Sequence, residues 1–157
     1  MTKIILLITF LTLSLSSQEL QIKAKLFNSD QKKGVSVFKG DVNIIKGNDE
    51  LNASRVVIYT DDEQQPKKFV AEGNASFVIQ TQDGSKYRGK AQKVVYIPKS
   101  KEYYFYGDVY LKQLNEKKEI IGSEVILKTV EGKAYARGKE EKPVIMIFNL
   151  PKDKEEK

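Results

Sequence analysis

Hydrophobic and polar residues alternate along most of the chain beyond its first 17 residues. The clearest stretch is Tyr103–Leu111, in which every second residue from Tyr103 onward is apolar or glycine. A period of two is typical of a β-strand with one buried face. The helical period of 3.6 residues is not found over a useful length beyond residue 17. We therefore expect an all-β protein with nine strands: Glu19–Phe27, Val35–Lys46, Leu51–Thr60, Lys67–Thr81, Ser85–Ile97, Glu102–Leu114, Glu119–Thr129, Lys133–Gly138 and Pro143–Leu150.

A strand with a central glycine is repeated along the chain. Copies centred about 33 residues apart contain Gly40, Gly73, Gly107 and Gly138. Glycine inside a strand weakens it, so its presence indicates a bend or a close approach of another backbone segment. Asp41 and Asp108 follow two of these glycines, and we interpret both as part of a turn or bulge. A repeat of this length is typical of an architecture in which stacked units cover one another's apolar faces.

Two strands differ from the others in how their faces are composed. In Leu51–Thr60 three apolar residues are consecutive, Val56 to Ile58, which indicates either a bulge or a strand buried on both faces. In Glu19–Phe27 the residues Ile22, Ala24 and Leu26 alternate with lysines, so we expect one apolar face and one cationic face.

The two ends of the chain differ from the patterned region. Lys3 is followed by an apolar run, Ile4–Leu15, and by small residues, which is the pattern of a cleavable signal peptide over residues 1–17. The run is shorter than the roughly 20 residues of a membrane-spanning helix, although an uncleaved anchor stays an alternative. We expect one folded domain over residues 18–150, a charged, disordered tail over 151–157, and export to a bacterial periplasm.

Composition narrows the possible chemistry. The chain has no Cys and no His, which removes cysteine nucleophiles, Ser–His pairs and the commonest metal ligands. The carboxylates at residues 61–63 lie in a polar loop, where a solvated turn is the simpler interpretation. The net charge is +6, but the lysines form no dense patch. We therefore predict no enzymatic activity, no metal, no cofactor and no nucleic-acid partner.

Alternation places a set of large apolar side chains on shared strand faces. Such a set forms either the packed core of a sandwich or the lining of a groove that admits acyl chains. The pattern does not separate the two and favours a packed core. The residues are Phe38, Val42, Ile44, Phe69, Phe77, Ile79, Tyr103, Phe105, Val109 and Leu111.

The order of the repeats resembles a known family. Phe38–Val42, then Leu51–Val57, then Ala71–Ala75, then Tyr103–Leu111 is similar to the OstA-like, or LptA, family of lipopolysaccharide-transport proteins, which also includes LptC and the periplasmic domain of LptD. The resemblance covers about residues 20–148. It implies a V-shaped β-jellyroll of two antiparallel sheets, with a groove that binds lipid A acyl chains through the ten residues above.

The resemblance also implies partners. Members of the family stack head to tail and would meet LptC-like and LptD-like proteins through edge strands. Open edges invite a further strand, and our candidates are the first and last strands. The edge residues are Ile22, Ala24 and Leu26 in the first strand, and Val144, Met146 and Phe148 in the last.

Rim lysines are a further expectation of the lipid-carrier interpretation. Lys23, Lys25, Lys39 and Lys46 would lie near the groove and screen lipid phosphates, with solubility as the simpler alternative. Two other functions stay open: a membrane-anchored LptC-type adaptor of the same pathway, and a structural envelope protein that binds no ligand.

Overall fold

The structure, a computed structural model, describes residues 18–152 of the chain. Within these residues every regular element is a β-strand, as the alternation predicts. There are ten strands rather than nine, because the predicted first strand is divided in two. They are β1 (Leu20–Lys23), β2 (Leu26–Asp30), β3 (Val35–Lys46), β4 (Asp49–Thr60), β5 (Pro66–Gln80), β6 (Lys86–Ile97), β7 (Glu102–Gln113), β8 (Lys118–Lys128), β9 (Lys133–Arg137) and β10 (Ile145–Phe148).

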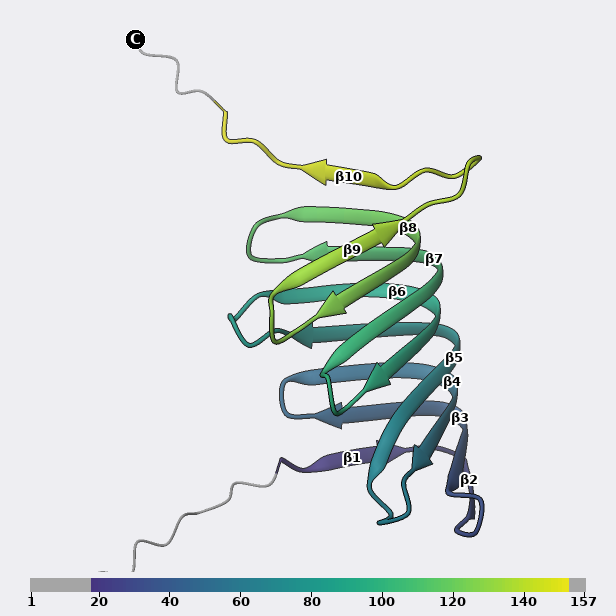
Figure 1. The fold of residues 1–157 in the computed structure, drawn as a ribbon. Helices are drawn as coiled ribbons and strands as arrows, with labels where there is room; N and C mark the ends of the chain where they lie inside the picture. Colours follow the sequence, from purple (N-terminus) through teal and green to yellow (C-terminus); the bar gives the residue numbers. More distant parts are fainter. Residues whose placement is uncertain (1–17, 153–157) are drawn as a thin grey trace, which may run out of the picture.

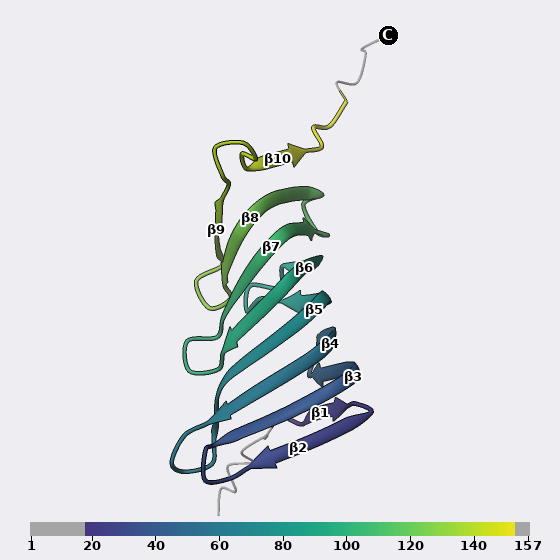
Figure 2. The ribbon, with the colours of Figure 1, turned by 90° about the vertical axis from the view of Figure 1, so that its right-hand side faces the viewer.

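The strands form two layers that share the long strands. All pairs are antiparallel, in the order β1-β3-β4-β5-β6-β7-β8-β10, while β2 pairs with β3 and β9 with β8. β1 and β2 pair with opposite halves of β3, and β10 and β9 with opposite halves of β8. We call the layer that contains β1 and β10 layer 1, and the layer that contains β2 and β9 layer 2. Figures 1 and 2 show β1 and β2 at one end of the stack and β9 and β10 at the other.

Each long strand passes from one layer to the other at a bulge. The register shifts after Lys39 in β3, after Glu72 in β5 and after Tyr106 in β7. At each of these bulges two residues face one residue of β4, β6 or β8, so one residue is inserted. The bulge residues are Gly40–Asp41, Gly73–Asn74 and Gly107–Asp108, and all six have positive φ. Glycine adopts this conformation freely, and Asp and Asn tolerate it better than other residues. The predicted bends, and the interpretation of the two aspartates as bulge residues, are thus confirmed.

The fourth repeated glycine has a different reason. Gly138 follows β9, where the chain crosses toward β10. A Cβ atom on Gly138 would lie 2.7 Å from the backbone of Pro143. Gly138 therefore marks a close backbone approach, the other outcome expected for these positions.

The prediction of one continuous apolar face in Glu19–Phe27 is wrong. The chain bends between β1 and β2, and this bend changes which side the following residues face. Leu26 pairs with Lys39 on the outside of layer 2, whereas Phe27 pairs with Phe38, and their tilted rings lie 4.9 Å apart between centroids.

β4 is buried on both faces, one of the two explanations offered for its three consecutive apolar residues, and the bulges lie in its neighbours rather than in β4 itself. Its register shifts opposite the bulges of β3 and β5, so its inward residues change phase. Val56 and Ile58 belong to the interior cluster, while Val57 points outward and is still only 4% exposed. It lies between Val37 and Val70 in a row of apolar cross-strand neighbours on the outer face of layer 2.

Candidate functional site

The space between the layers is apolar, and the structure brings all ten predicted interior residues together there. Seven are buried, including Phe105, Val109 and Leu111, which have no exposed surface. The other three, Phe38, Ile44 and Phe69, pack against this cluster but are only partly buried. Most of the predicted groove is therefore filled by its own side chains in this state.

A cavity of about 300 Å³ remains where β1 lies, between the end of layer 1 and the turns of layer 2. Ile44, Phe69, Ile79 and Tyr103 of the predicted set line it. The sequence reasoning missed other lining residues because they lie at turns or in strands of uncertain register. These are chiefly Leu20, Leu51, Pro66, Tyr96 and Pro98.

A series of aromatic rings leads from the cavity into the core. Phe69 lies 6.0 Å from Tyr96, and Tyr96 stacks on Tyr103 at 4.4 Å between centroids. Tyr103 in turn lies 6.0 Å from Phe105, which stacks on Phe77 at 4.4 Å. Phe77 and Phe105 are buried and do not line the cavity, so beyond Tyr103 the space between the layers is filled.

Polar side chains cross the rim of the cavity. Lys46 Nζ of layer 1 donates a hydrogen bond to the Tyr96 hydroxyl of layer 2, at 2.9 Å. The Tyr103 hydroxyl donates to Asp49 Oδ2 at 2.8 Å, and the other carboxylate oxygen of Asp49 accepts from the backbone N–H of Gln80. Burial, and then the charge of Asp49, raise the pKa of Tyr103, so its hydroxyl keeps its proton and acts as the donor.

The four lysines expected near the rim have separate positions. Lys46 lines the cavity. Lys25 forms an ion pair with Asp41 at the bulge of β3, with Nζ 2.8 Å from the carboxylate. Lys39 lies in the outward row with Leu26, and Lys23, at the end of β1, pairs with Asn43 of β3. Of these four, only Lys46 lies where it would meet a molecule in the cavity.

The predicted edge strands lie at the two ends of the sheet. β1 and β2 pair only with β3, and β10 and β9 only with β8, so within residues 18–152 the other side of each is open. Ile22 packs on the interior, whereas Ala24 lies in the bend between β1 and β2. At the other end Val144 packs on the interior, and Met146 and Phe148 are about half exposed.

A protein-family model described as LptA/(LptD N-terminal domain) LPS transport protein matches residues 21–133. The chain belongs to this family. The family is one of transport proteins rather than enzymes. No curated protein matches the sequence.

The fold has a counterpart among solved structures. The crystal structure of LptH, the LptA-homologous periplasmic component of the lipopolysaccharide transport device of Pseudomonas aeruginosa, matches with a TM-score of 0.75. The sequences are 17% identical, and the match covers 85% of this chain and 96% of LptH. At this identity the likeness concerns the fold, and it confirms the predicted jellyroll.

Two predictions lie outside the described residues. They are the signal peptide over residues 1–17 and, beyond residue 152, the charged tail. In the described region, from residue 18 to residue 152, there is no helix of the length and apolarity needed to cross a membrane.

Proposed function

We propose that this member of the LptA family is a periplasmic carrier of lipopolysaccharide. In this proposal the acyl chains of lipid A occupy the apolar space between the layers, while the sugars stay in water. The observation that supports it most is the apolar cavity beside β1, in a chain of a lipopolysaccharide-transport family. Each methylene group that leaves water contributes about 0.8 kcal/mol, so even part of one acyl chain would bind favourably.

The size of the cavity bears on how it would be filled. Its volume, about 300 Å³, is at the lower end of the range for ligand pockets. Only part of a lipid with several acyl chains fits without further movement of the layers. Phe69 and Ile44, which are partly exposed, would make the first contacts.

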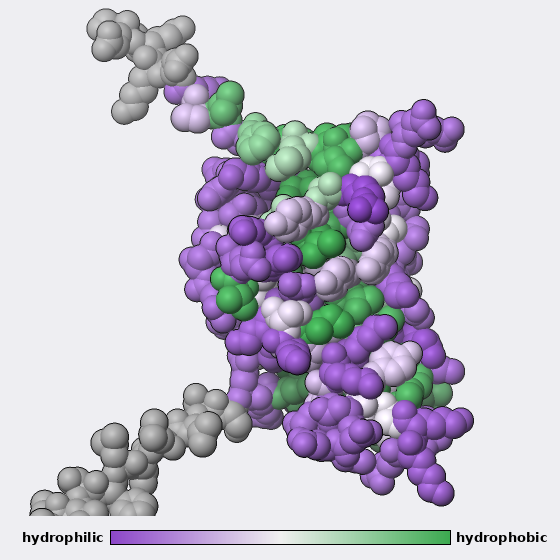
Figure 3. Space-filling view, in the orientation of Figure 1, coloured by the Kyte–Doolittle hydropathy of each residue, from purple (hydrophilic) through white to green (hydrophobic). Residues whose placement is uncertain are grey.

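The open edges support assembly into a bridge. We propose that β10 of one copy pairs with the β1–β2 end of the next, and that LptC-like and LptD-like proteins use the same two edges. Contacts between unlike edges form open chains rather than closed rings. Figure 3 shows apolar side chains gathered where β10 lies, and Ile145, Met146, Ile147 and Phe148 are each at least 40% exposed.

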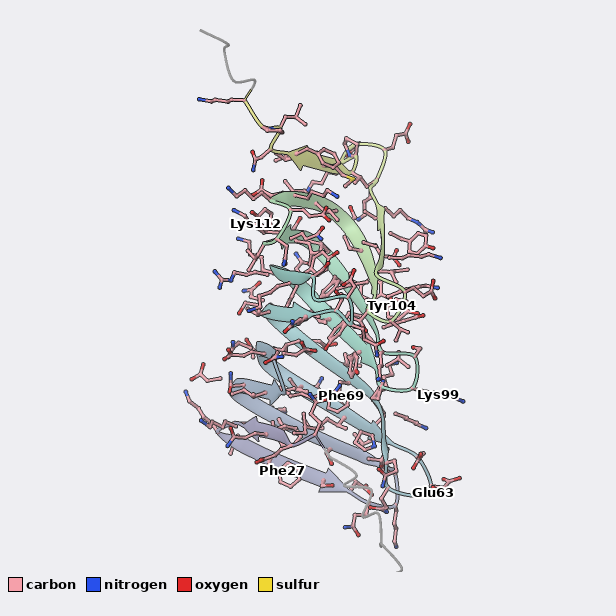
Figure 4. All side chains as sticks on the ribbon, turned by 90° about the vertical axis from the view of Figure 1, so that its left-hand side faces the viewer. Phe27, Glu63, Phe69, Lys99, Tyr104 and Lys112 are labelled. Carbon is pink, nitrogen blue, oxygen red and sulfur yellow. The ribbon has the colours of Figure 1, made fainter. Side chains whose placement is uncertain are left out.

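Site-specific photocrosslinking tests lipid binding. A photoreactive residue would replace Phe69, which lines the cavity, or Tyr104, which pairs with Val95 and Ile126 on the outer face of layer 2. Figure 4 labels both positions. In cells that make lipopolysaccharide, we expect a lipid crosslink at residue 69 and none at residue 104.

Each other outcome is informative. A crosslink at residue 104 alone would keep the carrier function but would place the lipid on the outer face of layer 2 instead of between the layers. No crosslink at either position, in folded and exported protein, would contradict the carrier function and favour a structural or adaptor role. Mass spectrometry of the exported protein tests localisation, because cleavage of the signal peptide removes about 17 residues.

A further inference from the structure

Turns of layer 1 meet turns of layer 2 along the side of the molecule that lies opposite the bulges. We call this side the mouth. The β3–β4 turn meets the ends of β6 and β7 through the Lys46–Tyr96 and Asp49–Tyr103 hydrogen bonds. The partners are 50 and 54 residues apart in sequence. Both bonds run between layers, so they hold the two layers together rather than neighbouring strands of one layer.

A second contact closes the mouth further along. The backbone N–H of Gln82, in the β5–β6 turn of layer 1, donates to the backbone carbonyl of Thr129 at 3.2 Å. Thr129 lies at the end of β8 in layer 2. Thr129 is itself held by its hydroxyl, which donates to the Lys101 carbonyl at 2.7 Å. The same turn of layer 1 reaches the β8–β9 turn, because a Cβ atom on Gly132 would lie 3.0 Å from a carboxylate oxygen of Asp83.

These contacts lie on the path that a lipid would take. A lipid with its acyl chains between the layers and its sugars in water must pass through the mouth. In this structure the mouth is crossed by hydrogen bonds, and the interior behind it is filled by Phe77 and Phe105. The cavity beside β1 is the part of the interior next to the Lys46–Tyr96 contact that remains open.

We propose that the Lys46–Tyr96, Asp49–Tyr103 and Gln82–Thr129 contacts form a latch, and that the layers must separate there before lipopolysaccharide enters. This inference rests on the proposed carrier function. The bulges on the opposite side are the hinge, because the strands turn from one layer into the other there. The backbone has positive φ at these turns, at Gly40, Gly73 and Gly107. Acyl chains that enter the cavity would replace the latch bonds with apolar burial, which favours the open state only when lipid is present.

The first test locks the latch. Since the chain has no cysteine, Gln82→Cys with Val130→Cys places two thiols next to the Gln82–Thr129 hydrogen bond, and a short bifunctional thiol reagent joins them. The matched control is Ser29→Cys with Ser36→Cys. These residues are cross-strand neighbours within layer 2, with hydroxyls 2.9 Å apart, so a link there leaves the mouth free.

The second test loosens the latch without any crosslink. Tyr103→Phe keeps the stacked ring and removes the hydroxyl that bonds Asp49. Tyr104→Phe is its control, because it removes an equivalent hydrogen bond to Glu102, at 2.6 Å, on the outer face. The readout for all proteins is the rate at which purified protein takes up fluorescently labelled lipopolysaccharide.

We expect the locked protein to take up lipopolysaccharide at least tenfold more slowly than the same protein before crosslinking, with no change for the Ser29–Ser36 link. Tyr103→Phe should accelerate uptake about fivefold, the order expected for one hydrogen bond, and Tyr104→Phe should not. Equal uptake by locked and unlocked protein would overturn the latch and leave the carrier function intact. No uptake by the unmodified protein would instead overturn the carrier function, and the latch with it.

Discussion

Phe105→Ala is the most direct test of how tightly the two layers pack. Phe105 has no exposed surface, stacks on Phe77 at 4.4 Å and lies 6.0 Å from Tyr103. Truncation of a buried Phe costs about 3–5 kcal/mol through lost transfer free energy and the cavity left behind. The two aromatic contacts add about 1 kcal/mol, so we expect a loss of about 5 kcal/mol in the free energy of unfolding, a large fraction of a typical domain's stability.

The assay is equilibrium unfolding in urea, followed by far-ultraviolet circular dichroism, because the chain has no Trp. Phe148→Ala is the matched control: the same side chain is removed from a position that is 53% exposed, and the expected loss is below about 1 kcal/mol. A loss below about 2 kcal/mol for Phe105→Ala would refute the reasoning. It would mean that the layers are not closed around this ring in solution and that the groove is open without lipid.

Three further predictions concern the bulge, the edge and the rim. Gly107→Ala should lower the free energy of unfolding by about 1–2 kcal/mol, measured in urea, because φ is +77° and the added Cβ would meet the Gln92 side chain. Ile147→Asp should weaken self-association, measured by sedimentation velocity, because a charge on an open apolar edge opposes pairing with another strand; unchanged association would contradict the role of β10. The pKa of Tyr103 is raised in the folded state by burial and by Asp49, so its contribution to stability is complete below pH 10 and decreases above it as the unfolded chain loses this proton. Above pH 10 the free energy of unfolding of the wild type should then fall by about 1.4 kcal/mol per pH unit more than that of Tyr103→Phe. Urea unfolding at several pH values measures both, and the same pH dependence for the two proteins would exclude this effect.

Alternation predicted some strands better than others for a geometric reason. In β5 the inward residues Phe69, Ala71, Ala75 and Phe77 keep a period of two across the bulge. The reason is that β5 has two residues, Gly73 and Asn74, where β6 has one. The pattern of β5 was therefore readable from sequence. So were those of β3 and β7, which have the same insertion.

The partner strands have the opposite property. In β4 the inward residues change phase between Ala53 and Val56, and in β6 between Ala91 and Val94. No glycine marks the change, since the insertion lies on the neighbouring strand. Tyr96 was missed as a cavity residue for this reason, and its ring is identified only once β6 is paired with its neighbours.

The sequence by itself determined the all-β class, every strand except the first, the positions of the bends and the set of residues that meets between the layers. These depend on side-chain period and on the backbone freedom of glycine, which are local properties. The tertiary structure alone decided that the interior is mostly filled, that the cavity lies beside β1, and that Lys46 and Asp49 meet Tyr96 and Tyr103 across the mouth. Which turn of one layer faces which turn of the other depends on how the two twisted layers lean against each other, a relation between segments about 50 residues apart that no local pattern encodes.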